Sequence, residues 1–423
     1  MRRSTSFLAA ALGLSLLGAA PIDAPPTAPP KPSVEPARLL RTLAHDPAGY
    51  NPERVQVATD LLLGDFLFHA PSTLGPRAQA LGISCNSCHT NGAGNRAFVI
   101  PGEKPTHPGL VDVSTDFFRK ESDDHRDNPI DIPSLRGVRY TAPFGHDGRT
   151  ASLYDFAQSV VVNEFAGAPL NWIELASLVI YMRDFDFLPN ANLDAQSRLT
   201  PRTSAEARRG ELAFKKPREG FDGRSCASCH VPSSFFRDGQ VHRIPVPIQA
   251  APSGFEDAFE TPTLLGLGET APYFHDGRFA TLAEVVAFFD TTFGLKLTPA
   301  ERADLVAYLD AVGAADAPED ARPLAKKLDA TWVYLELLGG SVVKDDRRVW
   351  ASVVALCTEA LDGAPRRPAY DERRLRLRDR LAALGSRAKS GANLEPLRAE
   401  PRALHTDLLR YGADLQGAIA AEP

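Results

Sequence analysis

The chain has 423 residues, a formal net charge of -6, and 43% hydrophobic residues. A chain of this length and composition predicts two or three folded domains with apolar cores. The negative charge and the lack of a basic, aromatic patch argue against a nucleic-acid partner. No segment after the first 20 residues is apolar enough to cross a membrane.

The N-terminal segment has the features of a secretory signal. Arg2 and Arg3 precede an apolar run over residues 7–17, which is too short to span a bilayer, and small residues follow at 18–20. We therefore expect a signal peptide over residues 1–20 and a periplasmic protein, with an uncleaved anchor or a disordered tail as the alternative. Residues 21–44 are rich in proline and predict a linker.

The predicted elements that follow occur in the same order twice. An amphipathic helix over residues 52–68 precedes the pentapeptide CNSCH, and one over 204–214 precedes CASCH. Further on, residues 133–153 (PSLRGVRYTAPFGHDGRTASL) align without gaps to residues 262–282 (PTLLGLGETAPYFHDGRFATL), with 12 of 21 positions identical. Apolar helices follow each copy, one over residues 172–185 and one that opens at Thr298-Pro299.

C-x-x-C-H is the attachment signature of c-type haem. Cysteines three apart lie on one side of a helical turn, where both can form thioethers to the haem vinyl groups, and the histidine then binds the iron. The six residues assigned to two haems are Cys85, Cys88, His89, Cys226, Cys229 and His230. A four-cysteine zinc site or structural disulfides leave both histidines unexplained, and a thioredoxin-like pair requires a βαβ context that the sequence does not show. Cys357 stands alone and is expected to be an inert, buried thiol.

We therefore predict an all-α fold with two tandem cytochrome c-type domains and a C-terminal helical extension. The first domain spans residues 45–195 and the second residues 196–313. Residues 314–423 are rich in Ala, Leu and Arg and form the extension, with helices expected over 325–338, 347–360, 371–384 and 397–419. A helical bundle that caps the second domain is favoured over a separate functional module.

The two C-x-x-C-H motifs, together with APYFHDGR in the second repeat, resemble the bacterial di-haem cytochrome c peroxidases and their relatives of the MauG type. The resemblance covers about residues 50–313. It implies two cytochrome c domains, a calcium ion between them, peroxide chemistry at the first haem, and an electron-transfer role for the second.

By this resemblance, Glu164 is the acid–base group of the first haem pocket, with a solvent-exposed loop carboxylate as the alternative. The peroxidases carry tryptophan where this chain has His146. Imidazole is a poorer hole carrier, so His146 can instead bond a haem propionate or lie in the domain interface. Arg149 is expected to bind a propionate through its planar fork. His275 and Arg278 take the same roles in the second copy, unless both segments are only structural turns.

The axial and calcium ligands are also implied by the resemblance. His107 or His125 is a possible distal ligand of the first haem, which can also be open at rest. The family's usual second-haem ligand would fall at Phe289, which cannot bind iron, leaving His242, Tyr273 or another residue. The expected calcium ligands are Asp131, Thr270 and Pro272, because Ca²⁺ prefers oxygen atoms.

The leading functional prediction is an exported di-haem oxidoreductase that reduces hydrogen peroxide with electrons from a small cytochrome c or cupredoxin. One alternative is a MauG-type high-valent haem oxidase that modifies a partner protein. The other is a non-enzymatic di-haem electron-transfer cytochrome. A homodimer is possible in each case, and no transmembrane segment is expected in the mature chain.

Overall fold

The computed structural model describes residues 52–102, 108–115, 117–118, 125, 128–244, 258–315, 354, 358, 361, 367–389 and 399–420. The predicted signal peptide, the predicted linker and the predicted helix over 325–338 lie outside these residues, as does most of the helix expected over 347–360. Below, residues 52–187 are called the first half and residues 188–315 the second half.

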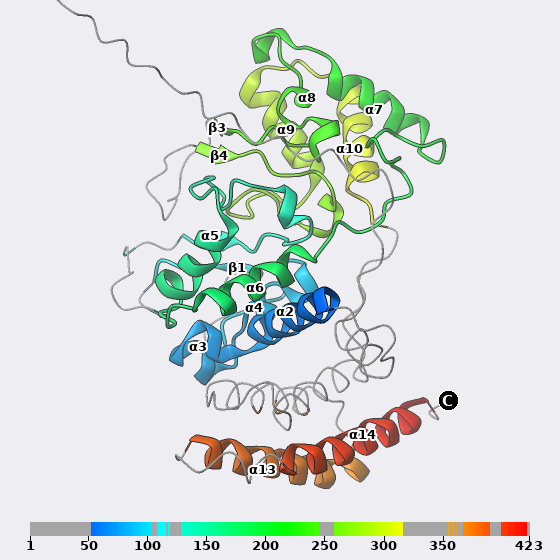
Figure 1. Cartoon of the computed structure of the whole chain (residues 1–423). Helices are drawn as coiled ribbons and strands as arrows, with labels where there is room; N and C mark the ends of the chain where they lie inside the picture. The colour runs from blue at the N-terminus through cyan, green and yellow to red at the C-terminus, as the bar shows by residue number, and fades with distance from the viewer. Residues whose placement is uncertain are drawn as a thin grey trace, which may run out of the picture.

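Helices make up most of the regular structure (Figure 1). The first half contains α2 (Pro52–His69), α3 (Pro76–Leu81), α4 (Cys85–Cys88), β1 (Leu110–Val111), β2 (Ile130–Asp131), α5 (Leu153–Ser159) and α6 (Trp172–Arg183). The second half contains α7 (Ala205–Lys215), α8 (Cys226–Cys229), β3 (Val241–Arg243), β4 (Ala258–Glu260), α9 (Leu282–Phe293) and α10 (Pro299–Gly313). The coarse prediction of a mainly helical fold is confirmed.

Two short antiparallel strand pairs correct the strictly all-α prediction. In the first half β1 pairs with β2, and Leu110 lies opposite Asp131. In the second half β3 pairs with β4, and Val241 lies opposite Glu260. Strands of two or three residues are too short to show an alternating pattern, so the sequence gives no sign of them.

In each half the first helix packs tightly on the last helix through a glycine. A Cβ on Gly64 of α2 would lie 2.1 Å from the Ser177 carbonyl oxygen of α6. A Cβ on Gly210 of α7 would lie 1.9 Å from the Asp304 carbonyl oxygen of α10. This close packing fixes the helix that leads into each C-x-x-C-H motif, and the same device serves both halves.

The helix ends agree with the capping residues read from the sequence. The Thr298 hydroxyl accepts a hydrogen bond from the Glu301 amide, and Pro299 opens α10. The Ser204 hydroxyl accepts one from the Ala207 amide at the start of α7. The observed bounds of α6 and α7 differ by no more than two residues from the predicted ones.

At the C-terminal end, α13 (Pro368–Lys389) and α14 (Ala399–Ala420) pack against each other. In Figure 1 they lie below the first half, while the second half lies above it. Their buried residues belong to the same hydrophobic cluster as those of α2 and α6, so the expectation that the extension caps the second domain is wrong. Their facing leucines recur at helical spacing and are fully or almost fully buried. The buried hydrophobic side chains described in this pair are Leu377, Leu381, Leu384, Leu404, Leu408, Tyr411 and Leu415. Among the described residues, no helix is both long and apolar enough to span a membrane.

Candidate functional site

The first C-x-x-C-H motif forms a single helical turn. Cys85 and Cys88 are the first and last residues of α4, and the His89 amide donates a 2.8 Å hydrogen bond to the Cys85 carbonyl oxygen. The turn is held at its start by Ser87, whose hydroxyl accepts a 3.0 Å bond from the Ser84 amide. Both cysteines are free thiols, and burial raises the pKa of each to about 12.

The second motif repeats this geometry in α8. The His230 amide donates a 2.9 Å bond to the Cys226 carbonyl oxygen, and the Ser225 amide donates a 3.0 Å bond to the Ser228 hydroxyl. Burial raises the pKa of Cys226 to about 11. Each turn therefore presents two uncharged, free thiols beside one histidine, in the arrangement that the motif predicts.

Both histidines of these motifs are oriented by a main-chain carbonyl. His89 Nδ1 lies 3.0 Å from the Pro133 carbonyl oxygen, and His230 Nδ1 lies 3.1 Å from the Phe236 carbonyl oxygen. When Nδ1 donates this bond, Nε2 keeps its lone pair, which is the form that binds a metal. Burial lowers the pKa of His89 to about 4 and also lowers that of His230, so both rings are neutral at pH 7.

These features fit a covalent c-type haem at each turn. The thiols are unpaired, and Cys85, Cys88 and Cys226 all pack against the hydrophobic cores of their halves. If haem is bound, the two cysteines and the histidine of each turn would hold it. A buried polar atom near the junction of the halves, His275 Nε2, has no hydrogen-bond partner, as expected if a bound group completes that environment.

Glu164 lies at the first motif. It ends a short π-helical turn, Val160–Glu164, that continues directly from α5. Its negative charge contributes to the raised pKa of Cys88, after the larger effects of burial and of Cys85. Arg149 Nη2 lies 3.5 Å from Glu164 Oε1. Burial raises the pKa of Glu164, and the Arg149 charge opposes that rise. The side chain is only 20% exposed, unlike an ordinary loop carboxylate.

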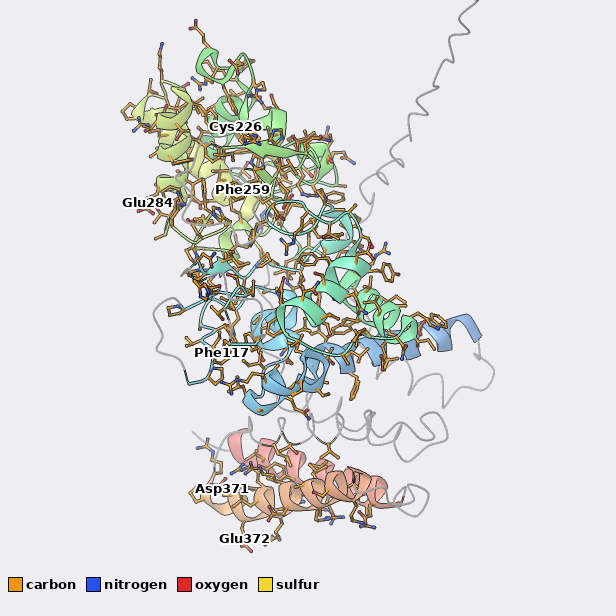
Figure 2. The ribbon with its side chains drawn as sticks, turned by 90° about the vertical axis from the view of Figure 1, so that its left-hand side faces the viewer. Phe117, Cys226, Phe259, Glu284, Asp371 and Glu372 are labelled. Carbon is orange, nitrogen blue, oxygen red and sulfur yellow. The ribbon has the colours of Figure 1, made fainter. Side chains whose placement is uncertain are left out.

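The two HDGR segments lie between the halves. The His146 carbonyl oxygen accepts a 3.0 Å hydrogen bond from the Glu260 amide, and the His275 carbonyl oxygen accepts a 2.7 Å bond from the Asp131 amide. His146 Nε2 also lies 3.1 Å from the Asp131 carbonyl oxygen. The His275 ring instead stacks on Phe259, with 4.3 Å between ring centroids. In Figure 2, Phe259 lies between Cys226 of the second half and Phe117 of the first.

The glycine of each HDGR segment packs on the strand pair of the other half. A Cβ on Gly148 would lie 2.8 Å from Val241 Cγ2 of β3, and one on Gly277 would lie 3.0 Å from Leu110 Cδ2 of β1. Both glycines have positive φ, at 64° and 63°. Each repeated segment is therefore part of the junction between the halves as well as a neighbour of its own haem motif.

Both HDGR arginines are paired with carboxylates. Arg149 Nη1 donates a 3.0 Å bond to Asp147 Oδ1, in addition to its contact with Glu164. Arg278 Nε lies 2.9 Å from Asp276 Oδ1 and 2.8 Å from Oδ2. The expected contact of these arginines with haem propionates stays a prediction.

The candidate axial ligands fall in different surroundings. His107 lies outside the described residues, and His125 is exposed on a backbone with φ of 59°. Phe289 packs among aromatic rings, 5.5 Å from Phe288 and 5.9 Å from Phe293 between centroids. Phenylalanine has no side-chain atom that can bind iron, and the contacts described for Phe289 are with other aromatic rings.

The two alternatives for the second haem also have local partners. His242 Nε2 lies 2.6 Å from Asp238 Oδ2, and both side chains gather with the Cys229 thiol within 4.8 Å. Such a cluster can hold a metal, but Cys229 is the residue assigned to a thioether. The other alternative, Tyr273, packs against the hydrophobic core of the second half.

The residues expected to bind calcium lie beside an arginine. Arg96 donates to the carbonyl oxygens of Gly268 and Glu269, the two residues directly before Thr270. Burial raises the pKa of Asp131 to about 8, although the Arg96 charge opposes the rise. A guanidinium therefore already occupies this neighbourhood, and a second cation fits it poorly.

Sequence reasoning missed Arg96 and its counterpart Arg237. The available signal was their equal spacing, because each follows the histidine of its C-x-x-C-H motif by seven residues. The residues around the two arginines differ, so the segments do not look alike.

Comparison with known proteins gives partial matches. The chain is 37% identical over 86 residues to the cytochrome-c peroxidase IdrP1 of Denitromonas iodatirespirans, and 40% identical over 65 residues to the protein of that name from Pseudomonas sp. (strain SCT). These matches cover 16% and 13% of this chain, and span only 23% and 17% of the relatives. No family model matches. The chain is related to the bacterial di-haem peroxidases, which confirms the resemblance read from the motifs.

Three solved structures show distant likenesses. A hydrazine synthase structure from Kuenenia stuttgartiensis has a TM-score of 0.42 and 21% identity, covering 74% of this chain and 99% of that chain. A MauG-like protein associated with microbial copper homeostasis has a TM-score of 0.43 and 18% identity, covering 60% and 88%. A variant of the diheme peroxidase BthA from Burkholderia thailandensis has a TM-score of 0.41 and 19% identity, covering 60% and 86%. The relationship therefore rests on the motifs and the two curated matches.

Proposed function

We propose that this chain is an exported, periplasmic di-haem c-type oxidoreductase that reduces hydrogen peroxide with electrons from a small cytochrome c or cupredoxin. The two halves correspond to the two cytochrome c domains of this proposal, with the first haem at Cys85, Cys88 and His89 and the second at Cys226, Cys229 and His230. Bound haem would supply the iron at which the O–O bond breaks.

The observation that carries the proposal is the position of Glu164. Its carboxyl group is within electrostatic range of Cys88, and burial raises its pKa. Reduction of one peroxide molecule to two waters consumes two electrons and two protons. A carboxyl group whose pKa is raised can accept the proton of the inner oxygen and return it to the departing oxygen. Glu164 is therefore assigned the proton transfer.

Arg149 supports this assignment through its charge. Its guanidinium contacts both Glu164 and Asp147, and it lowers the pKa of Glu164 against the effect of burial. It thereby keeps the carboxyl group able to release its proton after taking it up. His146 has a positioning role, because its side chain and main chain bond Asp131 and Glu260 at the junction of the halves.

The experiment is to purify the exported, haem-loaded chain and record its absorption spectrum before and after addition of hydrogen peroxide. The proposal expects a high-spin ferric component that changes on peroxide addition, and catalytic oxidation of reduced cytochrome c or cupredoxin. A purely low-spin spectrum that is inert to peroxide, also after partial reduction, would show a non-enzymatic electron-transfer cytochrome instead.

A MauG-type oxidase that modifies a partner protein is the second candidate, and Phe289 favours it. This phenylalanine stands where the resemblance expects an iron ligand, and it packs with Phe274, Phe288 and Phe293. A second haem without a methionine ligand would be reduced less readily, and this favours the MauG-type oxidase over the peroxidase. A peroxide-dependent spectral change without turnover of reduced donor proteins would support this candidate over the peroxidase.

A further inference from the structure

One arginine from each half donates hydrogen bonds to main-chain carbonyl oxygens of the other half. Arg96, in the first half, donates a 2.8 Å bond from Nε to the Glu269 carbonyl oxygen and a 3.0 Å bond from Nη2 to the Gly268 carbonyl oxygen. Both acceptors lie in the 3-10 turn Leu267–Glu269, just ahead of the second HDGR segment. The planar guanidinium thus binds two successive carbonyls at once.

Arg237, in the second half, makes the reverse connection. Its Nη1 donates to the carbonyl oxygens of Tyr140 and Ala142 in the first half, at 3.2 Å and 3.0 Å. Its Nε donates a 2.9 Å bond to the Thr261 carbonyl oxygen, and its Nη2 pairs with Glu260 at 2.5 Å. Arg237 is only 3% exposed, so almost all of its polar surface is satisfied by protein groups.

The two contacts are related by the internal repeat. Equivalent positions of the repeated segments differ by 129 in number, which pairs Tyr140 with Glu269. Each of these residues offers its carbonyl oxygen to the arginine of the opposite half. Each arginine also follows its own motif histidine, His89 or His230, by seven residues. The exchange is therefore reciprocal.

We propose that Arg96 and Arg237, here called the cross-half arginines, hold the two halves together in place of the calcium ion that the resemblance implies. The Arg96 guanidinium lies at the carbonyls next to Thr270 and within electrostatic range of Asp131. A divalent cation bound to Asp131, Thr270 and Pro272 would be repelled by this fixed positive charge. The arginines supply the positive charge and the directional bonds without an ion.

The position of Arg237 also connects the junction to the second haem motif. The carbonyl that orients His230 belongs to Phe236, the residue directly before Arg237. Movement of the Arg237 main chain would therefore tilt the His230 ring. This makes Arg237 a positioning residue for His230, whether or not the protein reacts with peroxide.

The test measures calcium and stability of the haem-loaded, full-length chain. The calcium content of the protein as purified is determined by elemental analysis, and its thermal unfolding midpoint is then compared after dialysis against a calcium chelator and in added calcium chloride. The proposal expects no stoichiometric calcium and the same midpoint in both solutions. Stoichiometric calcium whose removal lowers the midpoint would overturn it.

Variants then test the arginines themselves. Arg96→Gln and Arg237→Gln should lower the unfolding midpoint and speed hydrogen exchange of the Asp131 and Glu260 amides at the junction. Arg243→Gln, at an exposed position in β3, is the control and should change neither. If Arg237→Gln does not accumulate because the side chain is buried, Arg96→Gln decides alone, since Arg96 is exposed. An Arg96→Gln protein that behaves like the control would contradict the proposal.

The conservative variant separates charge from geometry. Arg237→Lys keeps the positive charge but cannot donate to four oxygens in a planar arrangement. We expect its junction amides to exchange at rates between those of the wild type and Arg237→Gln, and the spectrum of the second haem to shift because His230 is tilted. Wild-type exchange and an unchanged spectrum would show that Arg237 does not position His230.

Discussion

The main-chain amide of Asp131 donates a 2.7 Å hydrogen bond to the carbonyl oxygen of His275, which lies in the other half of the molecule. The reverse bond runs from the Glu260 amide to the His146 carbonyl oxygen at 3.0 Å. Because Asp131 precedes the first HDGR segment as Glu260 precedes the second, the two bonds are equivalent under the internal repeat. The repeated segments thus form the junction that holds the two halves, each with its own C-x-x-C-H motif, against each other.

Glu164→Gln tests the proton-transfer assignment. Glutamine keeps the size of the side chain but cannot accept and return a proton at neutral pH, so the peroxide-dependent spectral change should slow about 10²–10⁴-fold. The haem content should not change, because Glu164 is not one of the residues that attach the haem. Stopped-flow absorption with the haem-loaded protein measures the rate.

The matched control is Asp155→Asn, which removes an exposed carboxylate from the neighbouring helix α5. Its rate should equal that of the wild type. Equal rates for the Glu164→Gln protein and the wild type would remove Glu164 from the mechanism, and the proton would then have to move through water or another group.

Arg149→Gln should shift the pH dependence of the same rate. Burial raises the pKa of Glu164 and the Arg149 charge lowers it, so loss of that charge raises the pKa further. Below its pKa the carboxyl group is protonated and cannot accept a proton from peroxide. The acid limb of the pH–rate profile should therefore move to higher pH in the variant.

Arg278→Gln is the control for this shift, because Arg278 holds the equivalent position and pairs with Asp276. Its acid limb should stay in place. The stability of the Arg149→Gln protein gives a second measure with a defined sign. A folded-state pKa above the unfolded value means that stability is lost as pH rises through the folded pKa, and this loss should be greater without Arg149.

The sequence predicted much of the local structure. Both C-x-x-C-H motifs form the expected helical turns, and the helix that follows Thr298 begins where its capping residue indicates. These features depend on neighbouring residues, so a short stretch of sequence contains the information. Glu164 was placed by family resemblance, and the structure brings it to Arg149 from a different segment.

The contacts between the halves could not be predicted in the same way. The bond from Asp131 to His275 joins residues far apart in the chain and leaves no periodic pattern. Arg96 and Arg237 lie in segments of different sequence, GAGNRAF and SSFFRDG. A comparison of the two halves by sequence therefore does not pair the two arginines. Sequence also gave no sign that Gly148 and Gly277 contact the opposite strand pairs, since a turn glycine reads the same wherever it packs.

A pair of equivalent glycines tests the packing at the junction. Gly137 and Gly266 both have φ of 73°, but a Cβ on Gly137 would lie 2.0 Å from the Phe187 ring, whereas one on Gly266 meets nothing within 4 Å. Gly266→Ala should cost about 1–2 kcal/mol because of its left-handed backbone. Gly137→Ala should cost roughly 1–3 kcal/mol more, because the Phe187 ring must move.

Phe187 stacks with Phe235 and Tyr140, one from each half, so its displacement should also loosen the junction. Chemical denaturation of the two alanine variants gives the free energies of unfolding. Equal destabilisation by both substitutions would mean that the Phe187 ring moves without any loss in the free energy of unfolding. This aromatic stack would then not stabilise the junction between the halves.

Cysteine variants test covalent haem attachment at each motif separately. With haem bound to two thioethers, Cys88→Ala should weaken attachment at the first site and Cys229→Ala at the second, since each removes one of the two thiols that the helical turn presents. Cys85→Ala/Cys88→Ala should abolish covalent haem at the first site and leave the second loaded. Intact-mass measurement of the denatured protein counts the haems that remain.

Cys357→Ala is the matched control, because Cys357 belongs to neither motif and should leave both haems attached. The double variant also separates the two sites functionally. If the first haem reacts with peroxide, a protein with only the second haem should show no peroxide-dependent spectral change, although its second site is intact. If that protein still reacted with peroxide, the reaction would take place at the second haem site, formed by Cys226, Cys229 and His230. Glu164 would then have no part in it.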